Sequence, residues 1–133
     1  MAEAEKFIPK ILIADDDPEM RRMLRLHLET MDCQLVEAKD GEEALEAIVV
    51  ENPDLVLLDV MMPELNGWEI AKYIKSKAEY RHVKIIILTG IGATLNNLTA
   101  PVYGADDFID KPFNLDELEF KIRRALSRRN ADG

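Results

Sequence analysis

Five polar side chains stand where short apolar runs of the sequence end: Asp15, Asp16, Asp59, Thr89 and Lys111. If the apolar runs are strands of one parallel sheet, their carboxyl ends lie along one edge, and groups distant in sequence converge there. Two carboxylates ~4 Å apart repel each other by about 4 kcal/mol at an effective dielectric constant of about 20. Three carboxylates at such an edge therefore require either protonation or a bound cation.

The types of these side chains favour a hard cation together with a phosphoryl group. Carboxylate and carbonyl oxygens select Mg²⁺, with Mn²⁺ or Ca²⁺ as substitutes. Lys111 is a point charge that donates hydrogen bonds and Thr89 is a small hydroxyl donor, so both suit phosphoryl oxygens. An aspartate is a known nucleophile that forms an acyl phosphate, and phosphoryl transfer depends mainly on positioning and charge neutralisation.

The elements that must position these groups are short apolar runs alternating with helical patterns. Strands are expected at Lys10–Ala14, Cys33–Ala38, Leu55–Asp59, Val83–Leu88 and Ala105–Lys111. Continuous apolar runs are typical of strands buried on both faces of a parallel sheet. Alternation with helices predicts a single doubly wound α/β domain with right-handed crossovers.

The helices between these strands have recognisable starting points. Asp17 is expected to cap the first helix, with Pro18 at its first helical position. Later helices are expected to begin near Asp40, Gly67 and Asn114.

Two segments carry weaker or different expectations. Residues 91–103 contain two asparagines and Pro101, which predict a short or distorted fourth helix. The arginines of the last helix are expected on a solvated face: Arg123, Arg124, Arg128 and Arg129.

The overall composition narrows the class of protein and its surroundings. The chain has 133 residues, which suits one domain with one core, and its net charge of −9 disfavours nucleic acid and anionic membrane as partners. Cys33 is the one cysteine, so no internal disulfide forms and a reducing compartment fits. Neither a signal peptide nor an apolar run near ~18 residues is recognised, and a cytoplasmic location is expected.

Four motifs follow one another at intervals along the chain. They are Ile11–Pro18 (ILIADDDP), Leu57–Pro63 (LLDVMMP) with Gly67, Leu88–Gly90 (LTG) and Gly104–Phe113 (GADDFIDKPF). Together they resemble the receiver domain of bacterial two-component response regulators, with chemotaxis receivers as the nearest likeness. The resemblance implies a flavodoxin-like five-stranded sheet of order 2-1-3-4-5. Residues 10–129 are expected to form this domain, with 1–9 as an N-terminal extension and 130–133 as a tail or the start of a linker.

The resemblance also implies a role for each carboxylate. Asp59 would be the phosphoacceptor, taking the phosphoryl group from the phosphohistidine of a sensor histidine kinase or a phosphotransfer protein. Asp16 and Asp59 would ligate Mg²⁺ directly, together with the backbone carbonyl of Met61, and Asp15 would act through water. In this reading the chain is not an enzyme beyond catalysing its own phosphorylation and dephosphorylation.

The resemblance assigns the remaining groups to the switch. Thr89 and Lys111 would bind the phosphoryl oxygens, and the Lys111–Pro112 peptide bond would be cis. Phe108 occupies the position of the family's switch aromatic, although an ordinary core aromatic is an equally good reading. Met61 and Ile91 are apolar where the family tunes hydrolysis, which predicts a long-lived phosphorylated state.

The expected output is control of a downstream effector domain or a partner protein, and a homodimer is left open. The rival class is a phosphorylation-independent receiver-like interaction module, which would lack one of the aspartates, the threonine or the lysine. A flavodoxin-like cofactor binder is disfavoured, because three aspartates after the first strand would repel a phosphate. A small Mg²⁺-dependent phosphatase is also disfavoured, because 133 residues leave little room for a substrate-capping domain.

Overall fold

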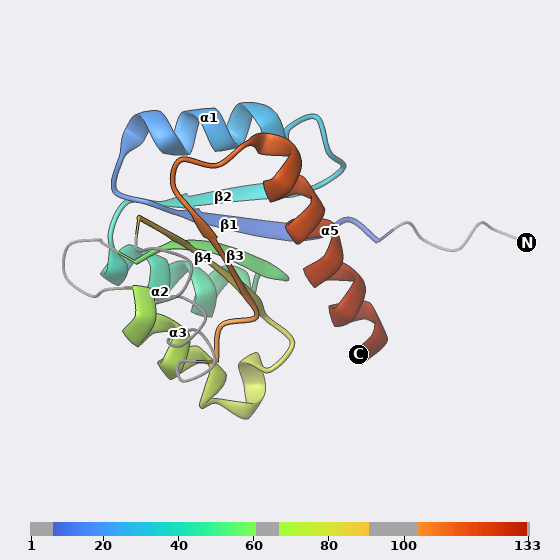
Figure 1. Cartoon of the computed structure of the whole chain (residues 1–133). Coiled ribbons are helices and arrows are strands. Elements are labelled where there is room, and N and C mark those ends of the chain that lie inside the picture. The colour runs from blue at the N-terminus through green and yellow to red at the C-terminus, as the bar shows by residue number, and fades with distance from the viewer. Residues whose placement is uncertain (1–6, 61–66, 91–103, 133) are drawn as a thin grey trace, which may run out of the picture.

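In the computed structural model, which describes residues 7–60, 67–90 and 104–132, a five-stranded parallel sheet lies between two layers of helices (Figure 1). The strands are β1 (Lys10–Ala14), β2 (Gln34–Ala38), β3 (Leu55–Asp59), β4 (Lys84–Thr89) and β5 (Asp107–Asp110). The helices are α1 (Pro18–Leu28), α2 (Gly41–Glu51), α3 (Gly67–Lys75) and α5 (Leu115–Asp132), with a 3₁₀ turn at Ala78–Tyr80. The strand order β2-β1-β3-β4-β5 confirms the predicted doubly wound fold.

The central strands are buried along their whole length, as their continuous apolar sequences predict. Every residue of β3 and of β4 is buried, and β3 lies between β1 and β4. The parallel register pairs Ala14 with Leu58, Asp59 with Leu88, and Thr89 with residue 110. The carboxyl ends of these strands are therefore level, and the residues that follow them share one edge of the sheet.

Local signals in the sequence set the ends of the first two helices. The Asp17 carboxylate accepts a hydrogen bond from the Glu19 amide at 3.0 Å, which confirms the predicted cap of α1. The Asp40 carboxylate caps α2 in the same way, accepting from the Glu43 amide at 2.8 Å. Asn52 ends α2 in the left-handed conformation with φ of 48°, directly before a proline.

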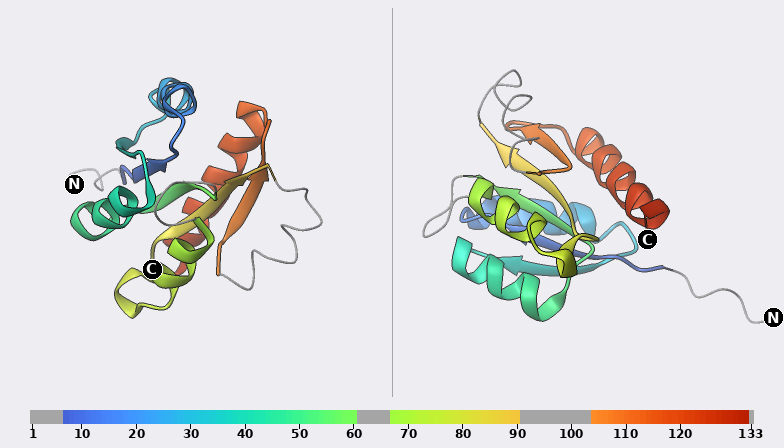
Figure 2. Two further views of the ribbon diagram at one scale, coloured as in Figure 1. Left: turned by 90° about the vertical axis from the view of Figure 1, so that its left-hand side faces the viewer. Right: turned by 90° about the horizontal axis from the view of Figure 1, so that it is seen from below.

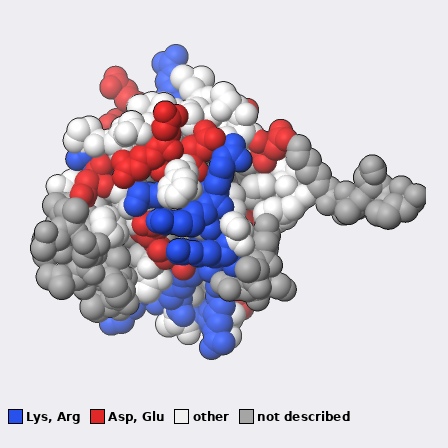
Figure 3. Space-filling model, turned by 45° about the vertical axis from the view of Figure 1, so that its right-hand side comes forward, with Lys and Arg blue, Asp and Glu red and all other residues white. Residues whose placement is uncertain are grey.

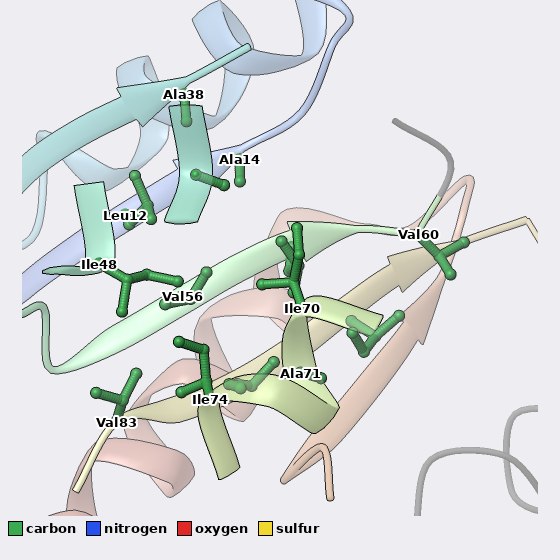
Figure 4. Close-up of a cluster of buried hydrophobic side chains, with 14 residues drawn as sticks. Leu12, Ala14, Ala38, Ile48, Val56, Val60, Ile70, Ala71, Ile74 and Val83 are labelled. Carbon is green, nitrogen blue, oxygen red and sulfur yellow. The ribbon is translucent and has the colours of Figure 1, made fainter. Parts of the chain in front are cut away.

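Two apolar layers attach the helices to the sheet, one on each face (Figure 2). On one face α2 and α3 pack against the strands through Ile48, Ile70, Ala71 and Ile74 (Figure 4). On the other face α1 and α5 pack through Leu24, Leu28, Leu118 and Ile122. Each fully buried Leu or Ile contributes roughly 1.5–3 kcal/mol, so both layers hold the edge of the sheet in place.

The structure corrects one prediction about the last helix. Arg124 is not on a solvated face: it is half-buried and hydrogen-bonded to the carboxylate of Asp107, which lies at the start of β5. The reason is tertiary, because the packing of α5 on the sheet brings Arg124 over that carboxylate. Arg123 and Arg128 are exposed as expected.

The ends of some elements also differ from the expected ones. β5 is shorter than the predicted strand, and α5 continues through residues 130–132, which were expected to be a tail. Helix continuation is reasonable there because no glycine or proline interrupts the sequence before Gly133. The irregular fourth helix predicted for residues 91–103 lies outside the described residues. Within the described part of the chain, no helix has both the length and the apolar character needed to cross a membrane.

Candidate functional site

Three carboxylates come together at the carboxyl edge of the sheet. Oxygen atoms of Asp15, Asp16 and Asp59 all lie within 4.8 Å of one another. Asp15 follows β1 and is completely buried, Asp59 ends β3 and is 5% exposed, and Asp16 is exposed. The fold therefore brings together the acidic residues expected to converge there, and one side of their cluster faces solvent.

Asp15 is held firmly by the elements around it. Its backbone amide donates to the Ala38 carbonyl of β2 at 3.1 Å, which extends the ladder between β1 and β2 by one residue. Its Oδ1 atom accepts a hydrogen bond from the Asp17 amide at 2.9 Å. Since Asp17 also caps α1, the turn that carries the acidic pair is fixed by the start of the helix.

Lys111 supplies a positive charge to the cluster from the segment after β5. Its Nζ atom lies 3.0 Å from Asp15 Oδ2, to which it donates, and 3.5 Å from Asp59 Oδ1. Burial alone would lower the pKa of this ammonium, but the hydrogen bond to Asp15 and the charge of Asp59 outweigh burial and raise the pKa above its ordinary value. Lys111 is therefore a protonated internal counter-ion of two buried carboxylates.

Backbone contacts place Thr89 and Lys111 beside each other. Thr89 ends β4 and is fully buried, and its carbonyl accepts a hydrogen bond from the Lys111 amide at 2.6 Å. The Lys111–Pro112 peptide bond is cis. Thr89 and Lys111 therefore lie side by side at the carboxyl ends of β4 and β5. β4 is paired with β3, the strand that carries Asp59.

Gly67, at the start of α3, lies close to the backbone at the Asp59 end of β3. Its amide donates to the Val60 carbonyl at 3.1 Å. A Cβ atom at this position would lie 2.6 Å from the Asp59 carbonyl oxygen and 2.9 Å from the Val60 Cα atom. Only glycine fits there without a shift of backbone. A side chain at this position would push the start of α3 away from the end of β3.

The composition of the cluster suits a hard divalent cation. With all three carboxyls ionised and Lys111 protonated, the site carries a net charge of −2 (three carboxylates and one ammonium). The donor atoms offered are oxygens, with no thiolate or imidazole in the cluster found among the described residues. Mg²⁺ binds through a few carboxylates and completes its shell with water and phosphoryl oxygens, so the donor set fits it.

Of the remaining residues predicted for the site and its switch, the structure describes Phe108. Phe108, on β5, is half-buried and packs against the apolar layer beneath α2 and α3. The Lys121 ammonium of α5 lies 5.5 Å from the centre of the Phe108 ring, within the range of a cation–π contact. Met61 and Ile91 lie outside the described residues.

Sequence reasoning missed a group of ionic contacts around β5 and α5. Asp107 accepts hydrogen bonds from Lys121 at 3.2 Å and from Arg124. Burial alone would raise the pKa of Asp107, but the hydrogen bonds from Arg124 and the Phe108 amide, with the charge of Lys121, hold it below its usual value. Figure 3 shows Lys and Arg side chains gathered on this side of the molecule below a band of Asp and Glu. No local spacing rule signals such pairs, because their members lie on different elements.

A second missed contact joins α1 to α5. The His27 imidazole lies 3.1 Å from one carboxylate oxygen of Glu119. The other oxygen of this carboxylate pairs with Arg123 at 2.9 Å. The Arg123 hydrogen bond, together with His27, lowers the pKa of Glu119. These contacts link the helices on the face of the sheet opposite to α2 and α3.

Comparison with known proteins gives the same picture as the geometry. Residues 11–123 match the family model described as the response regulator receiver domain. The probable transcriptional regulator ycf27 of Cyanophora paradoxa is 41% identical over 119 residues, which cover 90% of this chain and 48% of that protein. The transcriptional regulatory protein ResD of Bacillus subtilis is 38% identical over 119 residues, with the same coverage of 90% and 48%. The chain thus spans about half the length of these relatives.

Solved structures show the same likeness in three dimensions. A CheY-like response regulator receiver domain protein from Methanospirillum hungatei superposes with a TM-score of 0.87 at 28% identity, covering 96% of this chain and 100% of that one. The receiver domain of the Francisella response regulator 1452 gives a TM-score of 0.83 at 32% identity, covering 90% and 98%. On this evidence of sequence and fold, the chain belongs to the response regulator receiver domain family.

Proposed function

We propose that the chain is a phosphorylation-activated switch whose phosphoacceptor is Asp59. The observation that carries this proposal is the placing of Lys111 Nζ between two carboxylates, 3.0 Å from Asp15 and 3.5 Å from Asp59, at the end of a buried strand. A cationic donor next to Asp59 suits the binding of a phosphoryl group attached to that residue. A purely structural carboxylate at a strand end would need neither a lysine nor two further aspartates beside it.

The reaction transfers a phosphoryl group from a phosphohistidine nitrogen to a carboxylate oxygen of Asp59. The nitrogen–phosphorus bond breaks as the oxygen–phosphorus bond forms, and the electron pair of the broken bond remains on the imidazole nitrogen, which takes up a proton. Acetyl phosphate would donate in the same way, with acetate leaving. Asp59 is the nucleophile, and Lys111 and Thr89 bind the phosphoryl oxygens.

The residues proposed to hold Mg²⁺ are Asp16 and Asp59 with the backbone carbonyl of Met61, while Asp15 acts through water. Mn²⁺ would substitute for Mg²⁺ in the same donor set. When bound, the cation would neutralise the negative charge that the carboxylates and the phosphoryl group bring together. The three-carboxylate cluster supports this assignment.

The response to phosphorylation is a shift between two conformations. A dianionic phosphoryl group on Asp59 recruits Thr89 and Lys111, and the carboxyl ends of β4 and β5 move with these residues while Phe108 repacks. Shifting a two-state equilibrium from 1:99 to 99:1 takes about 5.5 kcal/mol. Two to three charge-assisted hydrogen bonds of roughly 1.5–3 kcal/mol each supply that much.

The partners proposed are a sensor histidine kinase or phosphotransfer protein upstream and an effector domain or partner protein downstream, in the cytoplasm. The effector is suggested by relatives that carry names of transcriptional regulators and are about twice as long as the matched region. We propose residues 10–129 as the switch domain and leave a homodimer open. The apolar Met61 and Ile91 side chains, which cannot orient a water molecule, predict a long-lived phosphorylated state.

The test is incubation with acetyl phosphate with and without Mg²⁺, followed by intact-protein mass spectrometry. The proposal expects the mass of one phosphoryl group to appear only when Mg²⁺ is present. The alternative, a phosphorylation-independent interaction module, expects no added mass under either condition, even in the presence of a phosphorylated histidine kinase.

A further inference from the structure

Arg21 of α1 reaches back to the turn that carries the acidic pair. Its Nη1 atom donates to the backbone carbonyl of Asp15 at 2.6 Å, and its side chain is only 18% exposed. The carbonyl of Asp15 belongs to the peptide bond that joins it to Asp16. Because that peptide is planar, holding its oxygen fixes the orientation of the peptide plane and with it the position of the Asp16 Cα atom, from which the Asp16 side chain extends.

Glu37 of β2 holds Arg21 in this position. One carboxylate oxygen of Glu37 lies 3.3 Å from Arg21 Nε, and the other accepts a hydrogen bond from Arg25 Nε. The guanidinium of Arg21 therefore bridges a strand residue and the acidic turn with two different nitrogens. A planar guanidinium with a fixed fork of donors suits this double contact, which a lysine ammonium cannot reproduce with the same geometry.

The other polar atoms of Asp15 are already bound within the site. Its amide donates to Ala38, Oδ1 accepts from Asp17, and Oδ2 accepts from Lys111. Arg21 completes this set from outside the acidic cluster, and within the site it touches the backbone of Asp15 rather than a carboxylate of the cluster. Its contact is therefore suited to orient the turn without competing for the oxygens offered to a cation.

We propose that Arg21, fixed by Glu37, is a positioning residue that sets the geometry of the Asp15–Asp16 pair for divalent cation binding. The inference rests on the proposed Mg²⁺-dependent function and names a residue that acts on the same site. Groups that orient metal ligands typically change metal affinity by about 10–100-fold when they are removed. Since Arg21 holds a carbonyl and not a ligand atom, we expect the lower end of that range.

The direction in which Mg²⁺ affinity changes when Arg21 is made neutral distinguishes a positioning role from a purely electrostatic role. Arg21 is a cation near three carboxylates, and removing a cation from an acidic site strengthens the binding of another cation. If Arg21 acted only through its charge, a neutral variant would bind Mg²⁺ more tightly. If it acts by orienting the acidic pair, the same variant binds Mg²⁺ more weakly.

The experiment measures Mn²⁺ binding by electron paramagnetic resonance and the Mg²⁺ dependence of labelling by acetyl phosphate. The variants are Arg21→Gln, Arg21→Lys and Glu37→Gln, with Arg22→Gln as the matched control. Arg22 is the next residue of α1 and is exposed, so its variant makes the same change of charge on the same helix. Thermal unfolding followed by circular dichroism establishes that each variant is folded at the temperature of the binding assay.

The expected result is a dissociation constant for Mn²⁺ raised about tenfold in Arg21→Gln and about threefold in Glu37→Gln. Arg21→Lys is expected between wild type and Arg21→Gln, and Arg22→Gln within about twofold of wild type. The Mg²⁺ concentration for half-maximal labelling rises in parallel, whereas the labelling rate at saturating Mg²⁺ stays within about twofold of wild type.

Three results would overturn the inference. Equal or tighter Mn²⁺ binding by folded Arg21→Gln would contradict positioning while leaving the proposed function intact. A lowered melting temperature with unchanged affinity would show a merely structural contact, and would equally refute the inference. Wild-type protein that neither binds Mn²⁺ nor becomes labelled would instead refute the proposed function, and the inference with it.

Discussion

The Lys111 ammonium donates a 3.0 Å hydrogen bond to Asp15, although 96 residues separate the two in sequence. The contact joins the ends of β1 and β5, which are not neighbours in the sheet. It also places a positive charge within 3.5 Å of Asp59, between these two strands. The Lys111 ammonium thus partly neutralises the buried carboxylates at this edge of the sheet. A bound divalent ion would take over part of this role.

Replacing Lys111 with methionine is expected to strengthen Mg²⁺ binding about tenfold or more. The ammonium repels a cation at the carboxylates it contacts, and at such distances this repulsion is several kcal/mol before solvent screening. Isothermal titration with Mg²⁺ measures the change. Lys121→Met is the matched control, because Lys121 bonds to Asp107 and lies on α5. Unchanged or weaker binding by Lys111→Met would contradict the role of Lys111 as counter-ion.

Replacing Gly67 with alanine is expected to lower the free energy of unfolding by about 1–3 kcal/mol. The new methyl group would lie 2.6 Å from the Asp59 carbonyl oxygen, so the backbone must shift where β3 leads into α3. Urea denaturation measures the loss. Gly90→Ala provides the comparison, since, apart from the chain neighbours of Gly90, no heavy atom of the residues that the structure describes lies within 4 Å of a Cβ placed there. Similar losses for the two variants would show that the close approach at Gly67 is not what limits substitution.

Replacing Asp107 with asparagine is expected to lower stability by about 1–2 kcal/mol at neutral pH, because the variant loses charged hydrogen bonds at a half-buried site. The folded state holds the pKa of Asp107 below its usual value, so between the folded and unfolded pKa values the unfolded chain binds more protons. The contribution is therefore fully present above the unfolded pKa of about 3.9. It is lost as the pH falls through the lower pKa of the folded state.

Urea denaturation of wild type and Asp107→Asn between neutral pH and pH values below about 3.9 checks this dependence. The difference in unfolding free energy should shrink across the acidic range. The control is Asp116→Asn, which removes an exposed carboxylate of α5 and should change stability by no more than about 0.5 kcal/mol. A difference between wild type and Asp107→Asn that stays constant with pH would rule out the ion pairs as its source.

Sequence reasoning was strongest where one physical rule acts over neighbouring residues. The unbroken apolar run ending at Asp59 predicts a fully buried parallel strand, and β3 is buried at every residue. Asp17 followed by proline predicts a capped helix, and the cap is present. Parallel topology then brings the carboxyl ends together, which is why Asp15, Asp16 and Asp59 were expected to meet.

Sequence reasoning failed where side chains from distant segments pair. Arg124 was expected in solvent because its own helix gives no reason for burial, yet Asp107 lies below it once α5 packs on the sheet. The Arg21–Glu37 pair likewise depends on how α1 lies against β2. Long flexible side chains accept many partners, so their pairing follows from packing that no residue spacing encodes.

The central claim is that Asp59 accepts the phosphoryl group, and the mass of the Asp59→Asn variant after incubation with acetyl phosphate and Mg²⁺ tests it most directly. Asn keeps the shape of the side chain but lacks the nucleophilic oxygen pair. Asp110→Asn, which changes the aspartate at the end of β5, two strands away from β3, serves as control. The account predicts one added phosphoryl group in wild type and Asp110→Asn, and none in Asp59→Asn. A phosphoryl group that still appears on Asp59→Asn would contradict it.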